Sequence, residues 1–486
     1  MRKSFWMVLG LSLLALPAEA KDPIGDSVVK IHATRREPDF VRPWAKATAQ
    51  ETSGSGVIIE GKRILTAAHM VLYAGQLFVQ ANQSTERVPA TVVAVAPGID
   101  LAVIRVDNAA FFDGRPPLPV AQEIPSVKQT VSVYGYPIGG EQLSVTQGIV
   151  SRIEYATLNY MTGGLRIQID AALNPGNSGG PAVSGGRIVG LVFSKISKAD
   201  NIGYLVAADE IVTFLKDVED GVYHGKPALW DEFQTAENPA LQAKLGLGKH
   251  AGIMVTRPFS AAADYPLKEW DVITRIGDQP VDSKGQVQLK EDLQVFFQYL
   301  IPKLAKNGRV KATIFRDRKT LELELPVRTD GNLLMPPLAG KYPRYFILGP
   351  MVFTAASLDL VARAGGQIIV QRSPLMTRMM DQRDFEGEEL VTMGFGMLSH
   401  AITKGYNSQA FAVVTRVNGT PVRNLTHLVE MLRDAQGEYI TFHFAGRYET
   451  IVFRRDELVK ATDDVLADEG IRKQYSDDLE GVWKKK

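Results

Sequence analysis

Short apolar runs rich in β-branched residues dominate the chain from about residue 24 to residue 215. Gly, Pro and Asn separate these runs, as expected for antiparallel strands joined by tight turns. Five of the clearest runs cover residues 57–59, 91–96, 101–106, 130–134 and 188–193. Their even spacing predicts a β-barrel or a β-sandwich. Between residues 208 and 220 the apolar positions change to helical spacing, which predicts an amphipathic helix at the end of this unit.

The rest of the chain repeats one order of predicted elements. In each copy a strand leads into a turn that ends in a Pro-Val pair. The two turns are Gly277-Asp278-Gln279-Pro280-Val281 and Asn418-Gly419-Thr420-Pro421-Val422. A helix at 425–433 and a strand at 439–444 follow the second turn. We therefore expect two related α+β modules, the second of which carries extra residues at 355–400.

Length and composition fit a globular protein of several domains. The chain has 486 residues, of which 45% are hydrophobic and 22% are charged, so we expect roughly two to four domains. It contains no cysteine, which excludes disulfides, thiolate metal sites and a lipoprotein anchor. Basic and acidic residues nearly balance, at 55 and 54, so charge gives no reason to expect nucleic-acid binding.

The first twenty residues have the pattern of a secretory signal peptide. Arg2 and Lys3 precede an apolar run at 5–16, and Ala18-Glu19-Ala20 supplies small residues for cleavage. The run is shorter than the roughly 20 residues that span a bilayer, so no stable membrane anchor is expected. We predict cleavage after Ala20 and a periplasmic location, with secretion as the alternative. An uncleaved anchor is the competing interpretation of the run.

A glycine-rich stretch contains the first candidate for chemistry, Ser178, in Asn174-Pro175-Gly176-Asn177-Ser178-Gly179-Gly180-Pro181. Glycines permit a sharp turn and leave room for a substrate backbone. His69 and Asp100 precede this stretch, each within apolar, strand-like residues. A serine hydroxyl attacks a carbonyl only when a neighbouring base removes its proton. The order His, Asp, Ser is that of the chymotrypsin-type triad, so these residues predict a serine endopeptidase.

Two other interpretations of this serine compete with the triad. A Gly-Ser-Gly segment alone is usually an ordinary turn. The spacing of Gly176, Ser178 and Gly180 also matches the nucleophile elbow of α/β-hydrolases, in which the acid and the histidine follow the serine. None of the later histidines has a comparable strand-end setting, and no alternating strand–helix pattern precedes Ser178. The pattern therefore favours a β-barrel protease.

The chain resembles the HtrA/Deg family of ATP-independent serine proteases over nearly its whole mature length. The motifs that carry the resemblance are Gly54-Ser55-Gly56-Val57-Ile58-Ile59, Leu65-Thr66-Ala67-Ala68-His69, Asp100-Leu101-Ala102-Val103-Ile104 and residues 167–181, the last being highly specific. The downstream half is similar to plant-type Deg proteases with two PDZ modules. The resemblance implies a mainly β fold, in which a chymotrypsin-like double β-barrel precedes two α+β PDZ-type modules.

The patterns and the resemblance together divide the chain into five segments. They are a signal peptide at 1–20, a trypsin-like protease domain at 21–225, a first PDZ domain at 226–335, a second PDZ domain with an insertion at 336–460 and a charged C-terminal tail at 461–486. Trp270 departs from the family pattern, in which glycine often precedes the position of Asp271. The fold of the first PDZ domain is still expected.

The triad and the resemblance together assign roles to single residues. Ser178 is expected to attack the scissile carbonyl, His69 to act as general base and then as general acid, and Asp100 to orient the imidazole. By resemblance, the backbone N–H groups of Gly176 and Ser178 form the oxyanion hole. Asp170 is the competing candidate for the triad acid, although its matching segment implies a structural role in the activation-loop region.

A strand downstream of the serine is expected to run beside the substrate backbone. Its residues are Val192, Phe193 and Ser194, and none of them is acidic, so nothing there attracts a basic side chain. An apolar pocket favours small or medium aliphatic residues, which unfolded chains expose. The expected partners are therefore unfolded proteins or peptides.

The PDZ modules are expected to differ in peptide binding. The first is predicted to bind extended peptides by strand addition at Ala251, Gly252 and Ile253, and a purely structural module with a blocked groove is the competing interpretation. The second is predicted to read peptides less well, because Pro350 lies in its opening segment and cannot donate to a strand ladder.

These features predict an endopeptidase of envelope protein quality control. The chain has no Gly-x-x-x-x-Gly-Lys-Ser/Thr motif, and the activity is expected to need no ATP, no other cofactor and no metal. The alternative is a peptide-binding chaperone or scaffold in which proteolysis is secondary. The resemblance implies a homo-oligomer built on trimers, with a hexamer as a further option. Phe40, Val41 and Trp44 are expected either at the trimer contact or packed on their own barrel.

Overall fold

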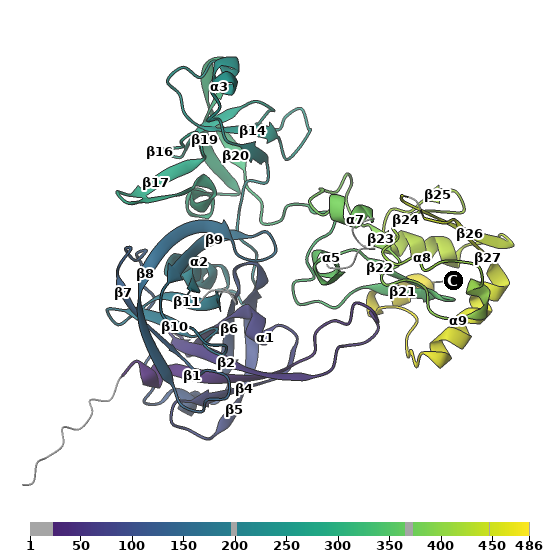
Figure 1. Ribbon diagram of the computed structural model, residues 1–486, viewed down its shortest axis with the longest axis horizontal. Helices are drawn as coiled ribbons and strands as arrows, with labels where there is room; N and C mark the ends of the chain where they lie inside the picture. Colours follow the sequence, from purple (N-terminus) through teal and green to yellow (C-terminus); the bar gives the residue numbers. More distant parts are fainter. Residues whose placement is uncertain (1–22, 196–201, 365–372, 447, 486) are drawn as a thin grey trace, which may run out of the picture.

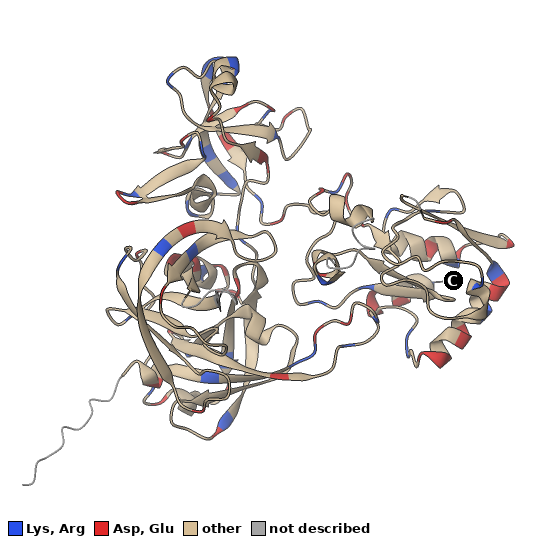
Figure 2. Cartoon of the chain, in the orientation of Figure 1, with Lys and Arg blue, Asp and Glu red and all other residues tan. Residues whose placement is uncertain are grey.

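The computed structural model describes residues 23–195, 202–364, 373–446 and 448–485, which form three parts (Figure 1). The predicted signal peptide at 1–20 lies outside the described residues. Two closed β-barrels make up the first part, and each of the two smaller modules forms a further part. Within the described ranges, no helix combines the length and the hydropathy needed to cross a bilayer. Basic and acidic residues are interspersed over all three parts (Figure 2).

The first barrel closes six antiparallel strands in the order β1–β2–β3–β6–β5–β4. Their bounds are β1 (Val28–Arg35), β2 (Gln50–Ile59), β3 (Arg63–Thr66), β4 (Ala74–Ala81), β5 (Arg87–Ala96) and β6 (Leu101–Val106). Alternate residues of a strand face opposite sides. Val29 and Ile31 are buried in the core of this barrel, whereas Leu101 and Val103 pack in the apolar layer shared with the second barrel. Burial on both sides explains why these strands read as continuous apolar runs.

The second barrel closes six strands in the order β10–β11–β12–β9–β8–β7. Their bounds are β7 (Thr130–Gly135), β8 (Ser144–Thr157), β9 (Gly163–Ile169), β10 (Pro181–Ser184), β11 (Arg187–Lys195) and β12 (Gly203–Ala207). The predicted amphipathic helix is α2 (Ala208–Asp217), whose Ile211 and Phe214 are buried in the layer between the barrels. The shorter helical segments are η1 (Gly25–Ser27), α1 (Ala68–Val71), η2 (Pro97–Ile99) and η3 (Ala109–Phe112). The predicted double barrel is confirmed.

The first smaller module is built on a sheet with the order β13–β14–β15–β19–β20, beside which β16 pairs with β15. Its elements are β13 (Glu232–Gln234), α3 (Pro239–Leu245), β14 (Ile253–Arg257), β15 (Val272–Ile276), β16 (Gln279–Pro280), the hairpin β17 (Gln286–Lys290) and β18 (Leu293–Phe296), η4 (Phe297–Leu300), α4 (Ile301–Leu304), β19 (Arg309–Arg316) and β20 (Lys319–Pro326). Trp270 has a φ of 74°, in the left-handed region that glycine favours. The tryptophan therefore keeps a turn for which the family pattern often uses glycine.

The second smaller module contains two sheets, β21–β22–β23 and β25–β24–β26–β27. Its strands are β21 (Tyr345–Leu348), β22 (Met351–Ala355), β23 (Val391–Thr392), β24 (Val414–Val417), β25 (Thr420–Pro421), β26 (Tyr439–Phe444) and β27 (Ile451–Arg454). Its helical segments are α5 (Leu358–Ala364), α7 (Pro374–Thr377), η5 (Ala401–Thr403), α8 (Leu425–Arg433), α9 (Arg455–Asp468), η6 (Asp477–Leu479) and α10 (Glu480–Trp483). Helix α8 begins after Asn424, whose side chain accepts the backbone N–H of His427 at 2.8 Å and so caps the helix. Pro350 lies in the turn between β21 and β22 and not within a strand.

The predicted C-terminal tail is an integral part of the second module. Helix α9 spans the predicted boundary between residues 460 and 461. Its buried side chains are Leu458, Ala461, Thr462 and Val465. Beyond the helix, residues 474–476 add to the free side of β21 through two backbone hydrogen bonds of 2.9 and 3.0 Å, and the Trp483 ring packs on Phe346 with 4.9 Å between ring centroids. Apolar burial and strand addition therefore hold the tail on its own module.

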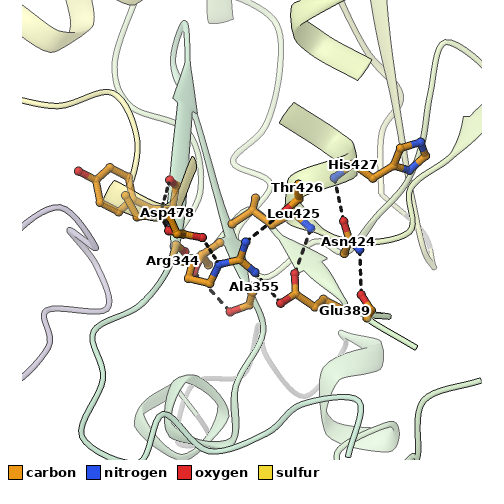
Figure 3. A network of polar contacts seen from close by, with 12 residues as sticks. Arg344, Ala355, Glu389, Asn424, Leu425, Thr426, His427 and Asp478 are labelled. Carbon is orange, nitrogen blue, oxygen red and sulfur yellow. Dashed lines mark hydrogen bonds and ion pairs between the residues drawn. The ribbon is translucent and has the colours of Figure 1, made fainter. Parts of the chain in front are cut away.

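Arg344 joins this C-terminal segment to the rest of the module (Figure 3). Its Nε lies 2.6 Å from Asp478 Oδ2, its Nη1 lies 2.6 Å from Glu389 Oε1, and its Nη2 donates to Thr426 Oγ1 at 3.0 Å. Burial opposes the charge on Asp478, but hydrogen bonds from Ser476 and Arg344 outweigh this effect and hold its pKa below the usual value. One guanidinium thus joins the C-terminal segment at η6, the segment that leads into β23 and the start of α8.

Replacing Arg344 with Met is expected to loosen the C-terminal segment, because two carboxylates lose their partner. We expect a cost of about 1–2 kcal/mol, less than for a fully buried pair, since Arg344 and Asp478 are 33% and 45% exposed. Hydrogen exchange followed by mass spectrometry should show faster exchange in residues 345–348 and 473–483. Arg454→Met, which removes exposed ion pairs and an exposed cation–π contact with Tyr439, is the matched control. Unchanged exchange in Arg344→Met would contradict this account of the tail.

The connection between β1 and β2 reaches from the barrels to the second module (Figure 1). Phe40 packs against an apolar cluster of the second module, and the Trp44 ring meets the Tyr345 ring edge-on, with 6.4 Å between centroids. Val41 is 54% exposed. Two of the three residues expected at a trimer contact or on their own barrel are therefore used for a contact with the second module of the same chain.

Candidate active site

His69 and Asp100 meet where two short helical turns of the first barrel come together. His69 lies on α1, after β3, and Asp100 follows η2 with a φ of 53°, a left-handed conformation that aspartate adopts more readily than most residues. The Asp100 carboxylate is 2% exposed and makes two contacts with His69. Oδ2 lies 2.6 Å from Nδ1, and Oδ1 accepts the backbone N–H of His69 at 2.8 Å. The carboxylate therefore orients the ring and favours a proton on Nδ1.

Ser178 lies on the loop between β9 and β10 of the second barrel, residues 170–180, which we call the serine loop. Backbone hydrogen bonds of 2.9 Å hold this loop to β2, to β11 and to itself. Gly179 has a φ of 80°, and a Cβ there would lie 2.3 Å from the carbonyl oxygen of Ser55, so glycine is required directly after Ser178. Within the described part of the chain, the Ser178 hydroxyl makes no hydrogen bond, either to His69 or to any other residue. Such bonds are often long in proteases without substrate, so Ser178 stays the candidate nucleophile.

Gly176 presents its N–H group away from the neighbouring loop. The carbonyl of Pro175 accepts the N–H of Ile138 at 2.7 Å. Because C=O and N–H point in opposite directions across a trans peptide, the N–H of Gly176 points away from Ile138. Neither this group nor the N–H of Ser178 has a hydrogen-bond acceptor among the described residues. Gly176 also has a φ of 101°, and a Cβ there would lie 2.4 Å from the carbonyl oxygen of Tyr136. Two backbone donors are thus available for an oxyanion.

Asp170, the competing acid, is used elsewhere. Its Oδ1 accepts the backbone N–H of Ile149 at 2.6 Å and ties the residue after β9 to β8. A Cβ at Gly148 would lie 2.5 Å from the same oxygen, so the two segments approach closely. The contacts with His69 come from Asp100 instead.

The strand expected beside the substrate is β11. Both backbone groups of Val192 are hydrogen-bonded to the serine loop. Its N–H donates to Gly180 O and its C=O accepts from Gly179 N, both at 2.9 Å. It therefore orients the loop and is not free to bind a substrate backbone. Phe193 is half-buried, and Ser194 pairs with Tyr204 of β12 after a register shift. Both of these stay predicted substrate contacts.

The strand expected to bind peptides in the first PDZ module lies inside its sheet. Met254 of β14 pairs with Gln234 of β13 on one side and with Val272 of β15 on the other. Ala251, Gly252 and Ile253 lie just before this stretch, and β13 occupies the side of β14 along which an added strand would continue, from Met254 to Arg257. Among the described residues, no strand lies on the outer side of β13. A peptide that extends past Ile253 along β14 would therefore have to displace β13, and the edge strands of this sheet are β13 and β20.

Ser55 belongs to the site, although the sequence motifs gave it no role there. Ser55 entered only as part of the Gly54-Ser55-Gly56 motif, yet it is fully buried and contacts the serine loop through its backbone and its side chain. Its position between two glycines was the available signal. A Cβ at Gly54 would lie 3.2 Å from the carbonyl oxygen of Ser178, which means that the two loops touch.

Comparison with known proteins places this chain in a family. Residues 54–191 match a trypsin-like peptidase domain, and residues 336–478 match a PDZ domain. The chain is 32% identical over 461 residues to Protease Do-like 2, chloroplastic, of Arabidopsis thaliana, covering 93% of this chain and 75% of that protein. It is 34% identical over 421 residues to Protease Do-like 4, mitochondrial, of Arabidopsis thaliana, covering 84% and 76%. The solved structure of the HtrA-type protease AlgW with tripeptide has a TM-score of 0.50 and 24% identity, covering 63% of this chain and 94% of that one, and it supports the fold alone. The chain therefore belongs to the Deg/HtrA family of serine proteases.

Proposed function

We propose that Ser178, His69 and Asp100 carry the endopeptidase reaction. Ser178 Oγ attacks the scissile carbonyl carbon while its proton passes to His69 Nε2. The imidazolium gives this proton to the leaving amine, and a water then repeats the step to release the acyl group. Asp100 keeps Nδ1 protonated and stabilises the imidazolium. The observation that carries the proposal is the double contact of the buried Asp100 carboxylate with His69.

The oxyanion of the tetrahedral intermediate would be held by the N–H groups of Gly176 and Ser178. Donors fixed in place before the reaction stabilise the developing charge without reorganisation. The outward direction of the Gly176 N–H supports this role, because the Pro175 carbonyl is held on the opposite side by Ile138.

The proposed substrates are unfolded or damaged proteins of the cell envelope, cleaved without ATP. The signal-peptide pattern at 1–20 supports export to the periplasm, with secretion as the alternative. The strand beside the serine contains Val192 and Phe193 and carries no acid, which favours the apolar residues that unfolded chains expose. The family resemblance supports a trimer-based assembly. A chaperone in which proteolysis is secondary is the second candidate, favoured by the open sheet edge at β13, where an extended peptide could add as a strand.

Unfolded substrate is expected to be cleaved much faster than the same protein in its native state. The test uses the full chain without ATP, one disulfide-containing client in native form, and the same client after reduction and carboxymethylation. We expect at least about tenfold faster cleavage of the unfolded form, because an extended backbone must enter the site. Gel electrophoresis and peptide mass spectrometry follow the products. Equal rates for the two forms would contradict the quality-control proposal, and binding without cleavage would favour the chaperone.

A further inference from the structure

Ser55 makes four hydrogen bonds that join β2 of the first barrel to other segments. Its N–H donates to Ser178 O at 2.9 Å, and its carbonyl accepts from Thr66 Oγ1 at 2.8 Å. Its Oγ donates to Gly176 O at 2.8 Å and accepts the N–H of Tyr136 at 2.8 Å. The side chain is fully buried. One residue thus contacts the carbonyls of both residues proposed to supply the oxyanion donors.

The direction of the two side-chain bonds is fixed by chemistry. A hydroxyl has one proton to donate, and a backbone N–H can only donate. Because Tyr136 donates to Oγ, the proton of Oγ is left for the carbonyl of Gly176. Each of these buried groups would be left unpaired without the hydroxyl, and an unpaired buried polar group is costly. The single hydroxyl therefore satisfies both buried groups at once.

These bonds fix the orientation of Gly176 from both sides. The peptide before Gly176 is held through Pro175 O and Ile138 N at 2.7 Å, and the peptide after it is held through its own carbonyl and Ser55 Oγ. With both peptide planes fixed, the N–H of Gly176 keeps its direction. Gly176 has a φ of 101° and no side chain, so nothing else in the residue resists rotation.

The packing around the hydroxyl indicates more than space filling. A Cβ at Gly135 would lie 3.0 Å from Ser55 Oγ, and a Cβ at Gly180 would lie 3.3 Å from Ser55 Cβ. Glycines on both neighbouring segments thus leave room for a serine here. The approach at Gly135 is to the hydroxyl oxygen itself, which alanine lacks, so the room on this side accommodates the hydroxyl.

We propose that Ser55 is a positioning residue that holds the oxyanion donor of Gly176, and the backbone of Ser178, in their reactive orientation. The inference rests on the proposed roles of Ser178 and Gly176. Ser55 does not touch the reacting atoms, and it acts through the peptide that follows Gly176. Its loss should therefore weaken binding of the transition state more than binding of the substrate.

The test compares Ser55→Ala with Ser27→Ala in the full-length mature protein. Ser27 is a fully buried serine of the same barrel whose Oγ donates to the carbonyl of Pro116 at 2.6 Å, away from the serine loop. We expect Ser55→Ala to lower kcat about 10- to 100-fold with KM within about twofold, since a misplaced donor costs part of what a deleted donor costs. Ser27→Ala should keep wild-type kcat. Affinity for a peptide boronate, which forms a tetrahedral adduct, should fall with kcat in Ser55→Ala.

Further variants distinguish failure of the proposed function from failure of the Ser55 proposal. Ser178→Ala, measured in the same assay, tests the proposed nucleophile. If that variant stays active, the proposed function is wrong, whatever the result for Ser55. If Ser55→Ala does not fold, Ser55→Cys places a weaker donor on a slightly larger side chain, and we expect an intermediate loss of kcat. Wild-type kcat and boronate affinity in a folded Ser55 variant overturn the proposal. Failure of both variants to fold also overturns it, because Ser55 would then serve stability alone.

Discussion

Ser178→Ala is expected to lower kcat for an unfolded substrate by about 10⁴-fold or more, because the variant has no nucleophile and triad residues act as a unit. The fold should survive the change. The Ser178 side chain is half-buried, and its hydroxyl makes no hydrogen bond within the described residues, so its removal leaves no described partner unpaired. We expect the free energy of unfolding to change by less than about 1 kcal/mol. Release of peptides from casein, measured over hours, gives the rate.

Binding separates loss of chemistry from loss of structure in this variant. Ser178→Ala should still bind an unfolded client and suppress its aggregation at least in part, because the substrate-binding surfaces are untouched. His69→Ala is the companion variant and should lose proteolysis to a similar extent, since an unactivated hydroxyl is left behind. Casein cleavage by Ser178→Ala at the wild-type rate, with contaminating proteases excluded, would contradict the assignment.

Asp100→Asn is expected to lower kcat about 10³- to 10⁴-fold with little change in KM. An amide NH₂ facing Nδ1 stabilises the tautomer that carries its proton on Nε2, and this tautomer cannot accept the proton of Ser178. The 2.6 Å contact between Asp100 Oδ2 and His69 Nδ1 makes the site sensitive to this change. Initial rates over a range of substrate concentrations separate kcat from KM.

Asp170→Asn is the matched control for this substitution. Its amide oxygen can still accept the N–H of Ile149, so the contact between β8 and the residue after β9 is kept. We expect kcat within about threefold of wild type. If Asp170→Asn were inactive and Asp100→Asn active, the two carboxylates would have exchanged roles and the site would have to be assigned again.

The sequence predicted the double barrel and the family because both leave local signals. Short apolar runs rich in β-branched residues, separated by turns that contain Gly, Pro or Asn, identify the strands of the two barrels. The family motifs around His69, Asp100 and Ser178 are contiguous, so each could be recognised without knowledge of the fold. The orientation of His69 by Asp100 followed from their order along the chain.

The features that the sequence did not predict depend on pairing between distant segments. The position of β14 inside its sheet depends on β13, a three-residue strand whose sequence carries no clear signal. The C-terminal segment has the charged composition of a tail, but a few buried residues and one arginine, Arg344, hold it on the second module. Ser55 and Gly176 lie 121 positions apart, so no local pattern could show their hydrogen bond.

Labelling with a fluorophosphonate probe followed by peptide mapping tests the central claim most directly. Such a probe phosphonylates a serine that a neighbouring base has activated, and the adduct shows which serine it is. We predict one adduct in the wild-type protein, on Ser178, and none in Ser178→Ala or His69→Ala. An adduct on a different serine, or cleavage of unfolded substrate that persists after full labelling of Ser178, would contradict the account.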